Sequence, residues 1–419
     1  MERDKSVRHA ASVPYTKRNL CPYAVYLMNL LPLFIIILVI AFLTGSDSLF
    51  YLAYVLGGIG LLTFVWMQQA LLGVQSRRRF SARAFHGEEV AVELDVTNQG
   101  RWPLLWLRVH ESVPLSLHVP NFEHRIVSLA PGEKTTLHYQ LNCQRRGYYH
   151  LGPLKLETGD LLQLTANREA VFDAEPFIVY PRVVPLRQLG LPSQLPFGNL
   201  PSRQRIFEDP SRFFGVRDYV PGDSLRQINW KSSARIRQLQ VKRFQPAIAL
   251  HTVILLDLND EAYSLRGRAV GGEMGIIVAA SIAAHLIERR QQVGLALLGR
   301  DQVTEYTGLQ VISPAHGREH LMRMLEALAR AEMTTTASLA SVLPQANAGL
   351  GWGSTAVVIS PGESPHLVDS LLQMRRQGFH VMFIATDPQT PFCRLQGKLE
   401  QIGIPAYWVT YEREMDVWR

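Results

Sequence analysis

Two long uncharged apolar runs stand near the start of the chain. The first covers 24–44 and reads AVYLMNLLPLFIIILVIAFLT; the second covers 49–72 and reads LFYLAYVLGGIGLLTFVWMQQALL. At about 1.5 Å per helical residue, each run is long enough to cross a hydrocarbon core of about 30 Å. The linker between them, GSDS, is so short that the sequence predicts an antiparallel transmembrane helical hairpin over 24–74.

Alternation of apolar and polar residues with a period of two replaces these runs beyond residue 84. One face of EEVAVELDVTNQG carries four apolar residues, Val90, Val92, Leu94 and Val96. Two further runs, LLWLRVHESV and TTLHYQLNC, are also typical of strands, and turn residues separate them. The pattern predicts a small antiparallel β-sandwich of the immunoglobulin kind over 84–182.

Apolar strands and helical stretches alternate in the last third of the chain. HTVILLDL and VGLALLG are typical of buried strands, and between them GGEMGIIVAASIAAHLIERRQ predicts a long amphipathic helix. The alternation continues through HGREHLMRMLEALARA, TAVVIS, PHLVDSLLQMRRQ and HVMFIA. It predicts an α/β domain over 246–419, with helices on both faces of a parallel sheet and ligand sites beyond the carboxyl ends of its strands. The fold class expected for the chain is therefore a membrane-anchored α+β multidomain protein.

Charge adds an orientation to this picture. The chain has 43 Lys and Arg against 36 Asp and Glu, a formal net charge of +7. Basic residues flank the predicted hairpin on both sides: Arg3, Lys5, Arg8, Lys17, Arg18, Arg77, Arg78, Arg79 and Arg83. Because positive flanks stay cytoplasmic, we expect a cytoplasmic tail over 1–23, a multi-pass protein of the bacterial inner membrane, and a cytoplasmic bulk. Contact with the lipid bilayer explains much of the basic excess, so we expect no nucleic-acid partner.

Motifs for familiar chemistry are scarce. The three cysteines, Cys21, Cys143 and Cys393, lie far apart without a CxxC, which fits neither a disulfide framework nor a zinc knuckle. The glycine-rich stretches GGEMG and GLGWG lack the spacing and position of a phosphate loop. The chain also has no GxSxG elbow.

One metal motif remains as an alternative. HGREH fits His-x-x-Glu-His, which on a helix places His316 and His320 on one zinc with Glu319 as the base. Gly317 lies inside the motif, and a third ligand is not evident. A zinc-dependent hydrolase using His316 and His320 is the alternative function.

The stretch with the most unusual composition is FFGVRDYVPGDSLRQINWKSSARIRQLQVKRF, residues 213–244, which we call the signature segment. It resembles the signature of the domain-of-unknown-function 58 family, in which Arg-x-Tyr-x-Pro-Gly-Asp leads into Arg-x-Ile-x-Trp and Ser-Ala-Arg. The matching residues are Arg217, Tyr219, Pro221, Gly222, Asp223, Arg226, Ile228, Trp230, Ser233, Ala234 and Arg235. The resemblance extends from the paired apolar runs through CQRRGYYHLGPLKLETGD and FIVYPRV into the last third of the chain.

The resemblance implies a C-terminal domain similar to a von Willebrand factor type A domain, which is Rossmann-like. It implies partnership with a MoxR-type AAA+ ATPase and with a membrane-bound transglutaminase-like protein, and it implies no enzymatic activity. A type A domain binds a divalent cation through Asp-x-Ser-x-Ser, a threonine and a later aspartate. Here the run reads Asp257, Asn259, Glu261, and Ser360 replaces the later aspartate. We expect a degenerate site without metal or cofactor, with weak cation binding as the alternative.

The signature segment, within a linker over 183–245, also has a structural interpretation. Pro221 and Gly222 suit a type II turn, and Asp223 can cap a helical turn that begins at Ser224. Ile228 and Trp230 are apolar enough to insert between the domains. The run RQLQVKRF predicts a strand that enters the α/β sheet, with Leu239 and Val241 on one face and Gln240 and Lys242 on the other.

Charge in the signature segment points to a partner. Asp218 and Asp223 are expected to pair with Arg226 and Arg235. The remaining cations, among them Lys231 and Arg237, should be available to an acidic protein surface. The sequence therefore predicts a non-enzymatic membrane-anchored scaffold or adaptor that acts with a MoxR-type AAA+ ATPase in the assembly or maturation of protein complexes.

Overall fold

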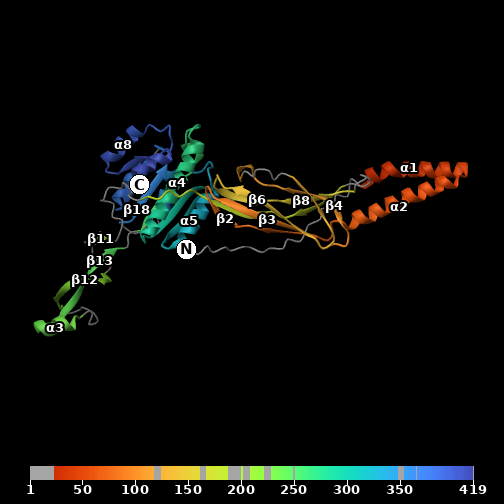
Figure 1. Cartoon of the computed structure of the whole chain (residues 1–419). Helices are drawn as coiled ribbons and strands as arrows, with labels where there is room; N and C mark the ends of the chain where they lie inside the picture. The colour runs from red at the N-terminus through yellow and green to blue at the C-terminus, as the bar shows by residue number, and fades with distance from the viewer. Residues whose placement is uncertain are drawn as a thin grey trace. The chain divides into compact units, whose positions relative to one another are not determined.

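The computed structural model describes residues 23–117, 124–160, 167–186, 200–201, 208–220, 228–248, 251–347, 353–364 and 366–418. The chain divides into two compact units, Met1–Arg182 and Val183–Arg419. The first unit contains a helical hairpin and a β-domain, and the second contains a β-ribbon and an α/β domain (Figure 1). The predicted division into five segments stays a prediction.

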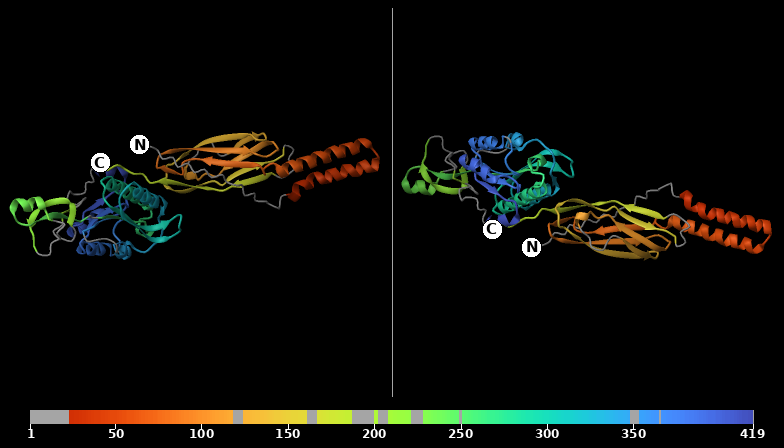
Figure 2. Two further views of the ribbon diagram at one scale, coloured as in Figure 1. Left: turned by 90° about the horizontal axis from the view of Figure 1, so that it is seen from below. Right: turned by 90° about the horizontal axis from the view of Figure 1, so that it is seen from above.

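The first unit begins with two apolar helices, α1 (Tyr23–Thr44) and α2 (Asp47–Gln69), which run side by side (Figure 2). The helices approach closely, because a Cβ added at Gly57 of α2 would lie 3.0 Å from the ring of Phe34. Helix α2 is long and apolar enough to cross a membrane, and it buries few of its side chains within the protein. It begins two residues earlier than predicted and ends three residues earlier, at Gln69, because the chain turns into a strand at Val74.

Within the described residues of the first unit, ten strands form the β-domain. They are β1 (Val74–Arg79), β2 (Arg83–Phe85), β3 (Glu89–Asn98), β4 (Leu104–Glu111), β5 (Arg125–Leu129), β6 (Lys134–Asn142), β7 (Gly147–Leu151), β8 (Leu154–Thr158), β9 (Arg168–Phe172) and β10 (Glu175–Tyr180). A 3-10 turn, η1 (Leu115–Leu117), follows β4. The strands pair in the orders β1-β3-β6, β5-β4-β8-β9 and β2-β10-β7. All these pairs are antiparallel except β2 with β10.

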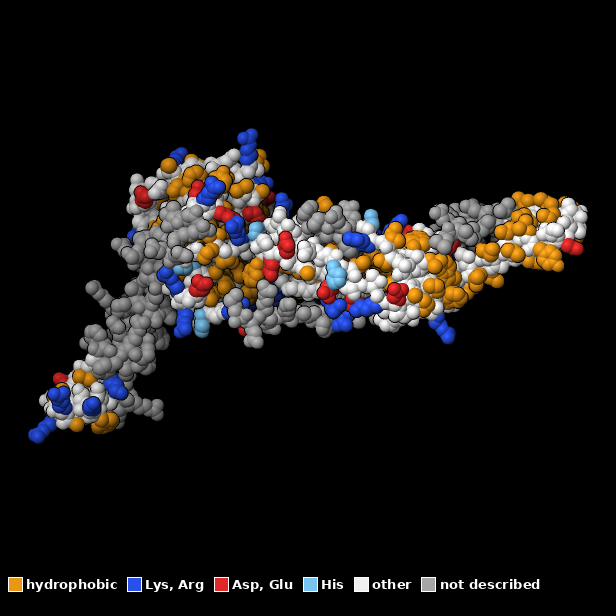
Figure 3. All heavy atoms as spheres, viewed as in Figure 1, with side chains coloured by type: hydrophobic (Ala, Val, Ile, Leu, Met, Phe, Trp, Pro, Cys, Tyr) orange, Lys and Arg blue, Asp and Glu red, His pale blue; other side chains and the backbone are white. Residues whose placement is uncertain are grey.

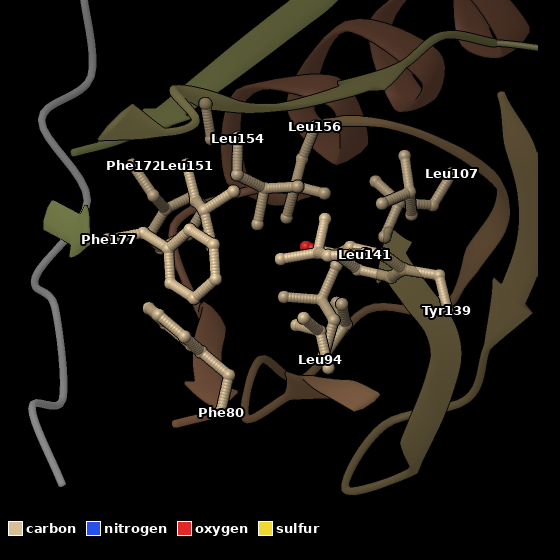
Figure 4. Close-up of a cluster of buried hydrophobic side chains, with 14 of the residues drawn as sticks. Phe80, Leu94, Leu107, Tyr139, Leu141, Leu151, Leu154, Leu156, Phe172 and Phe177 are labelled. Carbon is tan, nitrogen blue, oxygen red and sulfur yellow. The ribbon is translucent and has the colours of Figure 1, made fainter. Parts of the chain in front are cut away.

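One hydrophobic core joins strands of all three sheets. Figure 4 shows Phe80, Leu94, Leu107, Leu156 and Phe177 converging in its interior. The predicted alternation in β3 is confirmed, because its four inward-facing apolar residues are buried and their neighbours at Ala91 and Glu93 are not. The alternation forms because successive strand side chains point to opposite faces of a sheet.

Strand β1 corrects the interpretation of one basic flank. Arg77, Arg78 and Arg79 lie within it, and Arg78 points into the β-domain with an exposed fraction of 3%. Its guanidinium lies 2.8 Å from Glu111 and 3.3 Å from Glu175. Arg78 is therefore an internal ion-pair partner and is not available to lipid headgroups.

The α/β domain of the second unit is built on a seven-stranded sheet. Its strands are β14 (Thr252–Asp257), β15 (Val293–Asp301), β16 (Thr307–Ala315), β17 (Ala331–Glu332), β18 (Thr355–Ser360), β19 (His380–Ala385) and β20 (Ala406–Trp408). The order is β16-β15-β14-β18-β19-β20, with the short β17 paired to β15. Strands β15, β14, β18, β19 and β20 are parallel, and the edge strand β16 is antiparallel. This is the doubly wound order, in which the chain reverses direction across the sheet between β14 and β18.

Helices cover both faces of this sheet, as expected. They are α4 (Arg268–Glu288), α5 (Arg318–Arg330), α6 (Leu339–Asn347), α7 (Leu367–Arg376) and α8 (Phe392–Gln401), with the 3-10 turns η3 (Asp260–Ala262) and η4 (Glu412–Trp418). Helices α6, α7 and α8 share one core with Val253, Leu255 and Val358 of the sheet. Helix α4 packs on the other face, where Gly275 approaches Leu256 and Ile359. The prediction of an amphipathic α4 is wrong, because the helix is buried on nearly all sides.

A separate β-ribbon belongs to the same unit. It contains β11 (Leu200–Pro201), β12 (Glu208–Asp218), β13 (Gln240–Ile248) and the short helix α3 (Trp230–Ile236). Strand β13 pairs antiparallel with β12 and β11. The prediction that this strand enters the α/β sheet is therefore wrong, since β13 belongs to a sheet of its own.

Candidate functional site

The described part of the signature segment folds as a compact turn between β12 and β13. The amide N–H of Ser232 donates to the side chain of Asn229 at 3.2 Å, which caps α3, and Arg237 ends the helix with a left-handed φ of 58°. The hydroxyl of Ser233 accepts the backbone N–H of Gln240 at 2.9 Å. These bonds fasten α3 to the start of β13.

The carboxylate of Asp218 has a partner within the β12–β13 ladder, while its predicted pairing with Arg226 stays a prediction, because Arg226 lies outside the described residues. The carboxylate accepts a hydrogen bond from the side chain of Gln240, which lies opposite it in the β12–β13 ladder. The guanidinium of Arg217 donates to the backbone oxygen of Asp218 at 3.1 Å. The predicted turn and cap, with Pro221, Gly222, Asp223 and Arg226, lie outside the described residues. Their predicted roles stay predictions.

Burial in the segment contradicts two expectations. Trp230 is 67% exposed, whereas Ile228 is 4% exposed and pairs with Val241 across the ribbon. Trp230 is the first residue of the short helix α3, and its ring is exposed to solvent. The predicted alternation around 239–242 is also wrong, because Leu239 is exposed and Gln240 is buried by its bonds to Asp218 and Ser233.

These exposed residues form a mixed apolar and cationic surface, which we call the α3 patch. It consists of Trp230, Lys231, Arg235, Ile236 and Arg237, all exposed. Figure 3 shows basic and hydrophobic side chains gathered around α3. The α3 patch joins an aromatic side chain to three cations, and Trp and Arg are enriched in the centres of protein interfaces.

We expect Trp230→Ala to change the free energy of unfolding by less than about 0.5 kcal/mol, because an exposed ring loses little on truncation. The smaller change Ile228→Val should cost about 1 kcal/mol, because it removes a buried methyl group. Urea unfolding of the full chain measures both values. A loss at Trp230 larger than that at Ile228 would contradict the exposed position of the indole.

A second group of candidate residues lies where the sheet reverses direction, at the carboxyl ends of β14 and β18. The carboxylate of Asp257 is buried, and it accepts hydrogen bonds from the backbone N–H of Asn259 at 3.0 Å and the hydroxyl of Ser360 at 3.1 Å. Burial raises the pKa of Asp257 to about 6, and these two donors offset only part of that effect. The structure thus brings together Asp257, Asn259 and Ser360. The exposed Glu261 donates its backbone N–H to the Asn259 side chain at 3.3 Å.

Threonines that the sequence analysis did not single out complete this edge. The backbone of Thr334 pairs with Asn259, and the N–H of Thr336 donates to the Asn259 side chain at 3.3 Å. The hydroxyl of Thr335 donates to Asp260 at 2.9 Å. The run Met-Thr-Thr-Thr was the available signal, because the resemblance called for a threonine on another loop.

Asp387 connects its own loop, which follows β19, to Ser264 and Trp408 through hydrogen bonds. Its two carboxylate oxygens accept the N–H of Ser264 at 2.7 Å and the hydroxyl of Ser264 at 2.9 Å. The indole of Trp408 donates to the backbone oxygen of Asp387 at 3.2 Å. Within the described residues, no three His, Cys, Asp or Glu side chains converge in a metal-binding group.

The geometry contradicts the zinc hypothesis. Helix α5 begins only at Arg318, so His316 precedes it and cannot share a helical face with His320. His320 is buried, and its Nε2 lies 2.6 Å from the backbone oxygen of Val293. At that distance Nε2 donates its hydrogen to the carbonyl and has no lone pair for a metal.

The second unit of the chain therefore consists of a β-ribbon, which contains the signature segment, and a doubly wound α/β domain that follows it. Residues 215–361 match the model of the family described as protein of unknown function DUF58. The resemblance to this family is thereby confirmed over residues 215–361. The match includes the whole α3 patch together with Asp257 and Ser360.

The chain is also similar to a curated relative and to several solved structures. The chain is 25% identical over 273 residues to the uncharacterized protein YeaD of Bacillus subtilis. The aligned region covers 62% of this chain and 63% of that protein's length. A von Willebrand factor type A structure from Catenulispora acidiphila is 13% identical, with a TM-score of 0.29 over 42% of this chain and 43% of that one. An aerotolerance-related membrane protein from Bacteroides fragilis is 12% identical, with a TM-score of 0.29 over 40% of this chain and 94% of that one. The CARDB domain of PF1109 from Pyrococcus furiosus is 16% identical, with a TM-score of 0.19 over 25% of this chain and 86% of that one.

Proposed function

We propose that this chain is a non-enzymatic, membrane-anchored adaptor that binds a MoxR-type AAA+ ATPase and helps to assemble or mature protein complexes. The observation that carries the proposal is the α3 patch, in which an exposed indole stands among three exposed cations inside the DUF58 match. A membrane-bound transglutaminase-like protein is the second candidate partner, through the same family resemblance.

The composition of the α3 patch favours an acidic protein surface as its partner. Lys231, Arg235 and Arg237 provide positive charge that accelerates encounter with a negative surface. Trp230 and Ile236 provide apolar area that leaves water on contact. Helix α3 and its C-cap residue bring these apolar and cationic side chains together in the folded ribbon.

The carboxyl edge of the sheet supports an adaptor over an enzyme. Asp257 is closed off by its own neighbours, Asn259 and Ser360, and lies 1% exposed. Ser360 donates its hydrogen to Asp257 while itself being fully buried, so its oxygen does not face a substrate. A catalytic base or nucleophile has to reach its substrate, and neither side chain does so in this arrangement.

Binding of a purified MoxR-type ATPase to the full chain in detergent tests the proposal. We expect the triple variant Lys231→Glu, Arg235→Glu, Arg237→Glu to weaken binding at least tenfold at low salt, chiefly through slower association. The matched control reverses three exposed arginines of the α/β domain, away from the ribbon: Arg300→Glu, Arg376→Glu and Arg394→Glu. Circular dichroism checks folding of both variants. Equal loss in both would assign the effect to net charge, and no loss in either would reject the α3 patch as the binding site.

Placement in the inner membrane is part of the same proposal. Helices α1 and α2 would cross the bilayer as a hairpin, with both of its ends and the bulk of the chain in the cytoplasm. Exposed apolar side chains along α2, such as Tyr51, Leu61 and Phe64, support this placement.

We expect protease added to intact spheroplasts to leave the β-domain and the α/β domain uncut, because both lie behind the membrane. Lysis should expose both to cleavage, which is followed with antibodies against each terminus. Cleavage of the β-domain before lysis would reject a cytoplasmic orientation, and with it an encounter with a cytosolic ATPase.

A further inference from the structure

The end of helix α2 is hydrogen-bonded to the β-domain. The indole N–H of Trp66 donates to the backbone oxygen of Pro103 at 3.0 Å, and the indole N–H of Trp102 donates to the side chain of Gln69 at 2.8 Å. The guanidinium of Arg168 donates to the backbone oxygen of Gln68 at 3.2 Å. The last turn of α2 therefore contacts both the β3–β4 turn and the start of β9.

The backbone segments at this junction are packed closely against each other. Strand β1 begins at Val74, and the N–H of Gln99 donates to the backbone oxygen of Gly73 at 2.8 Å. A Cβ added at Gly73 would lie 2.3 Å from the backbone nitrogen of Gly100, so only glycine permits this approach. The β3–β4 turn is consequently held beside the C-terminal end of α2.

The length of α2 indicates the depth in a bilayer at which this junction would lie. From Asp47 to Gln69 the helix extends about 34 Å at 1.5 Å per residue, close to the hydrocarbon thickness of about 30 Å. If Asp47 lies at one surface of a bilayer, Gln68 and Gln69 lie at the other. Trp66 then stands at the depth where tryptophan rings collect in membrane proteins.

Side chains around this junction have the character of a membrane-interface surface. We call them the collar, which consists of Trp66, Leu72, Arg101, Trp102 and Leu105. Leu72 and Leu105 are exposed although they are apolar, and Arg101 is exposed in the β3–β4 turn. Figure 3 shows hydrophobic side chains continuing from α2 onto the adjoining end of the β-domain.

We propose that the collar is a phospholipid-binding surface that seats the end of the β-domain in the headgroup layer. Leu72, Leu105 and the two indole rings contact the upper acyl chains, and Arg101 binds lipid phosphate. The bilayer is the occupant because the collar continues directly from an apolar helix of membrane-spanning length. The inference rests on the proposed membrane anchoring, and it adds that the β-domain is held rigidly against the bilayer.

Nitroxide labels at three sites of the full chain test the collar in nanodiscs of phosphatidylethanolamine and phosphatidylglycerol. The background is C21S/C393S, because Cys143 is buried. Arg101→Cys labels the collar, and Gly58→Cys labels the middle of α2, where a side chain has open space. The control Glu89→Cys labels the other end of β3, about 30 Å away at 3.3 Å per residue.

The readout is relaxation of each label by a lipid with a nickel-chelating headgroup, by a water-soluble nickel complex and by oxygen. We expect headgroup nickel to relax the label at 101 several-fold more than the label at 89, while the label at 58 responds to oxygen and not to soluble nickel. Equal headgroup relaxation at 101 and 89, with 58 still in hydrocarbon, would overturn the collar and leave the anchoring intact. Access of soluble nickel to 58 would overturn the anchoring itself. A label at 101 shielded from water without headgroup relaxation would mean that a protein covers this face, which also overturns the collar.

Discussion

Arg78→Met should lower the free energy of unfolding by about 3–5 kcal/mol, the usual effect of removing one member of a buried ion pair. Arg78 and Glu111 are 3% and 4% exposed. The Arg78 guanidinium donates to Glu111 at 2.9 Å and to the backbone oxygen of Asp173 at 2.8 Å. Methionine fills a similar volume but leaves the Glu111 carboxylate and that carbonyl without their donor.

The loss at Arg78 should depend on pH. Burial raises the pKa of Glu111, and Arg78 offsets only part of this effect. Without Arg78, the folded state binds a proton at Glu111 more tightly than the unfolded state does, so stability falls as pH rises. The deficit of Arg78→Met should therefore be smaller near about pH 5 than near about pH 8.

Chemical denaturation of Arg78→Met, Glu111→Gln and the double variant at both pH values measures these effects. The double variant should recover part of the loss, because the pair is coupled. Arg79→Met is the matched control on the same strand: its pairs with Glu93 and Asp95 lie nearer the surface, so it should cost less than about 1 kcal/mol. Equal losses at Arg78 and Arg79 would contradict a buried pair.

Asp257→Asn should remove a pH dependence of stability from the α/β domain. Burial raises the pKa of Asp257 from 3.8 to about 6, so the folded state holds this proton more tightly than the unfolded state. The contribution of Asp257 to the free energy of unfolding is greatest below about pH 4. It decreases as the pH rises from about 4 to about 6. At higher pH the ionised carboxylate lowers the free energy of unfolding by roughly 3 kcal/mol, which asparagine avoids.

Thermal and denaturant unfolding of wild type and Asp257→Asn between about pH 4 and 8 tests this expectation. The two proteins should be nearly equal in stability at the acidic end, and the variant should be more stable at the alkaline end. Glu261→Gln, an exposed change in the same loop, serves as the control. A variant that is less stable than wild type at about pH 8 would show that the charge at Asp257 stabilises the fold, as a bound cation would make it do.

Local patterns were enough to predict much of the architecture. The alternation around Val90–Val96 identified β3, and the alternation of strands with helices in the last third identified the α/β domain and placed Asp257 and Ser360 at strand ends. These features depend on periodicity, which the backbone geometry of strands and helices imposes on any sequence.

Other features depended on contacts between distant residues. The basic run 77–79 reads as a membrane flank, yet Arg78 meets Glu111 and Glu175 inside the β-domain, because β1 pairs along β3 and turns every second side chain inward. Trp230 is apolar and resembles a core residue, yet α3 presents its ring to solvent.

The sequence by itself determined the apolar helices, the α/β class and the family resemblance. The tertiary structure decided that β13 belongs to its own ribbon, that His320 donates to a backbone carbonyl, and that Thr334, Thr335 and Thr336 border the Asp257 edge. The physical reason is that periodicity reports which side of its own element a residue occupies, whereas its partner and its burial are set by which other element packs against that side.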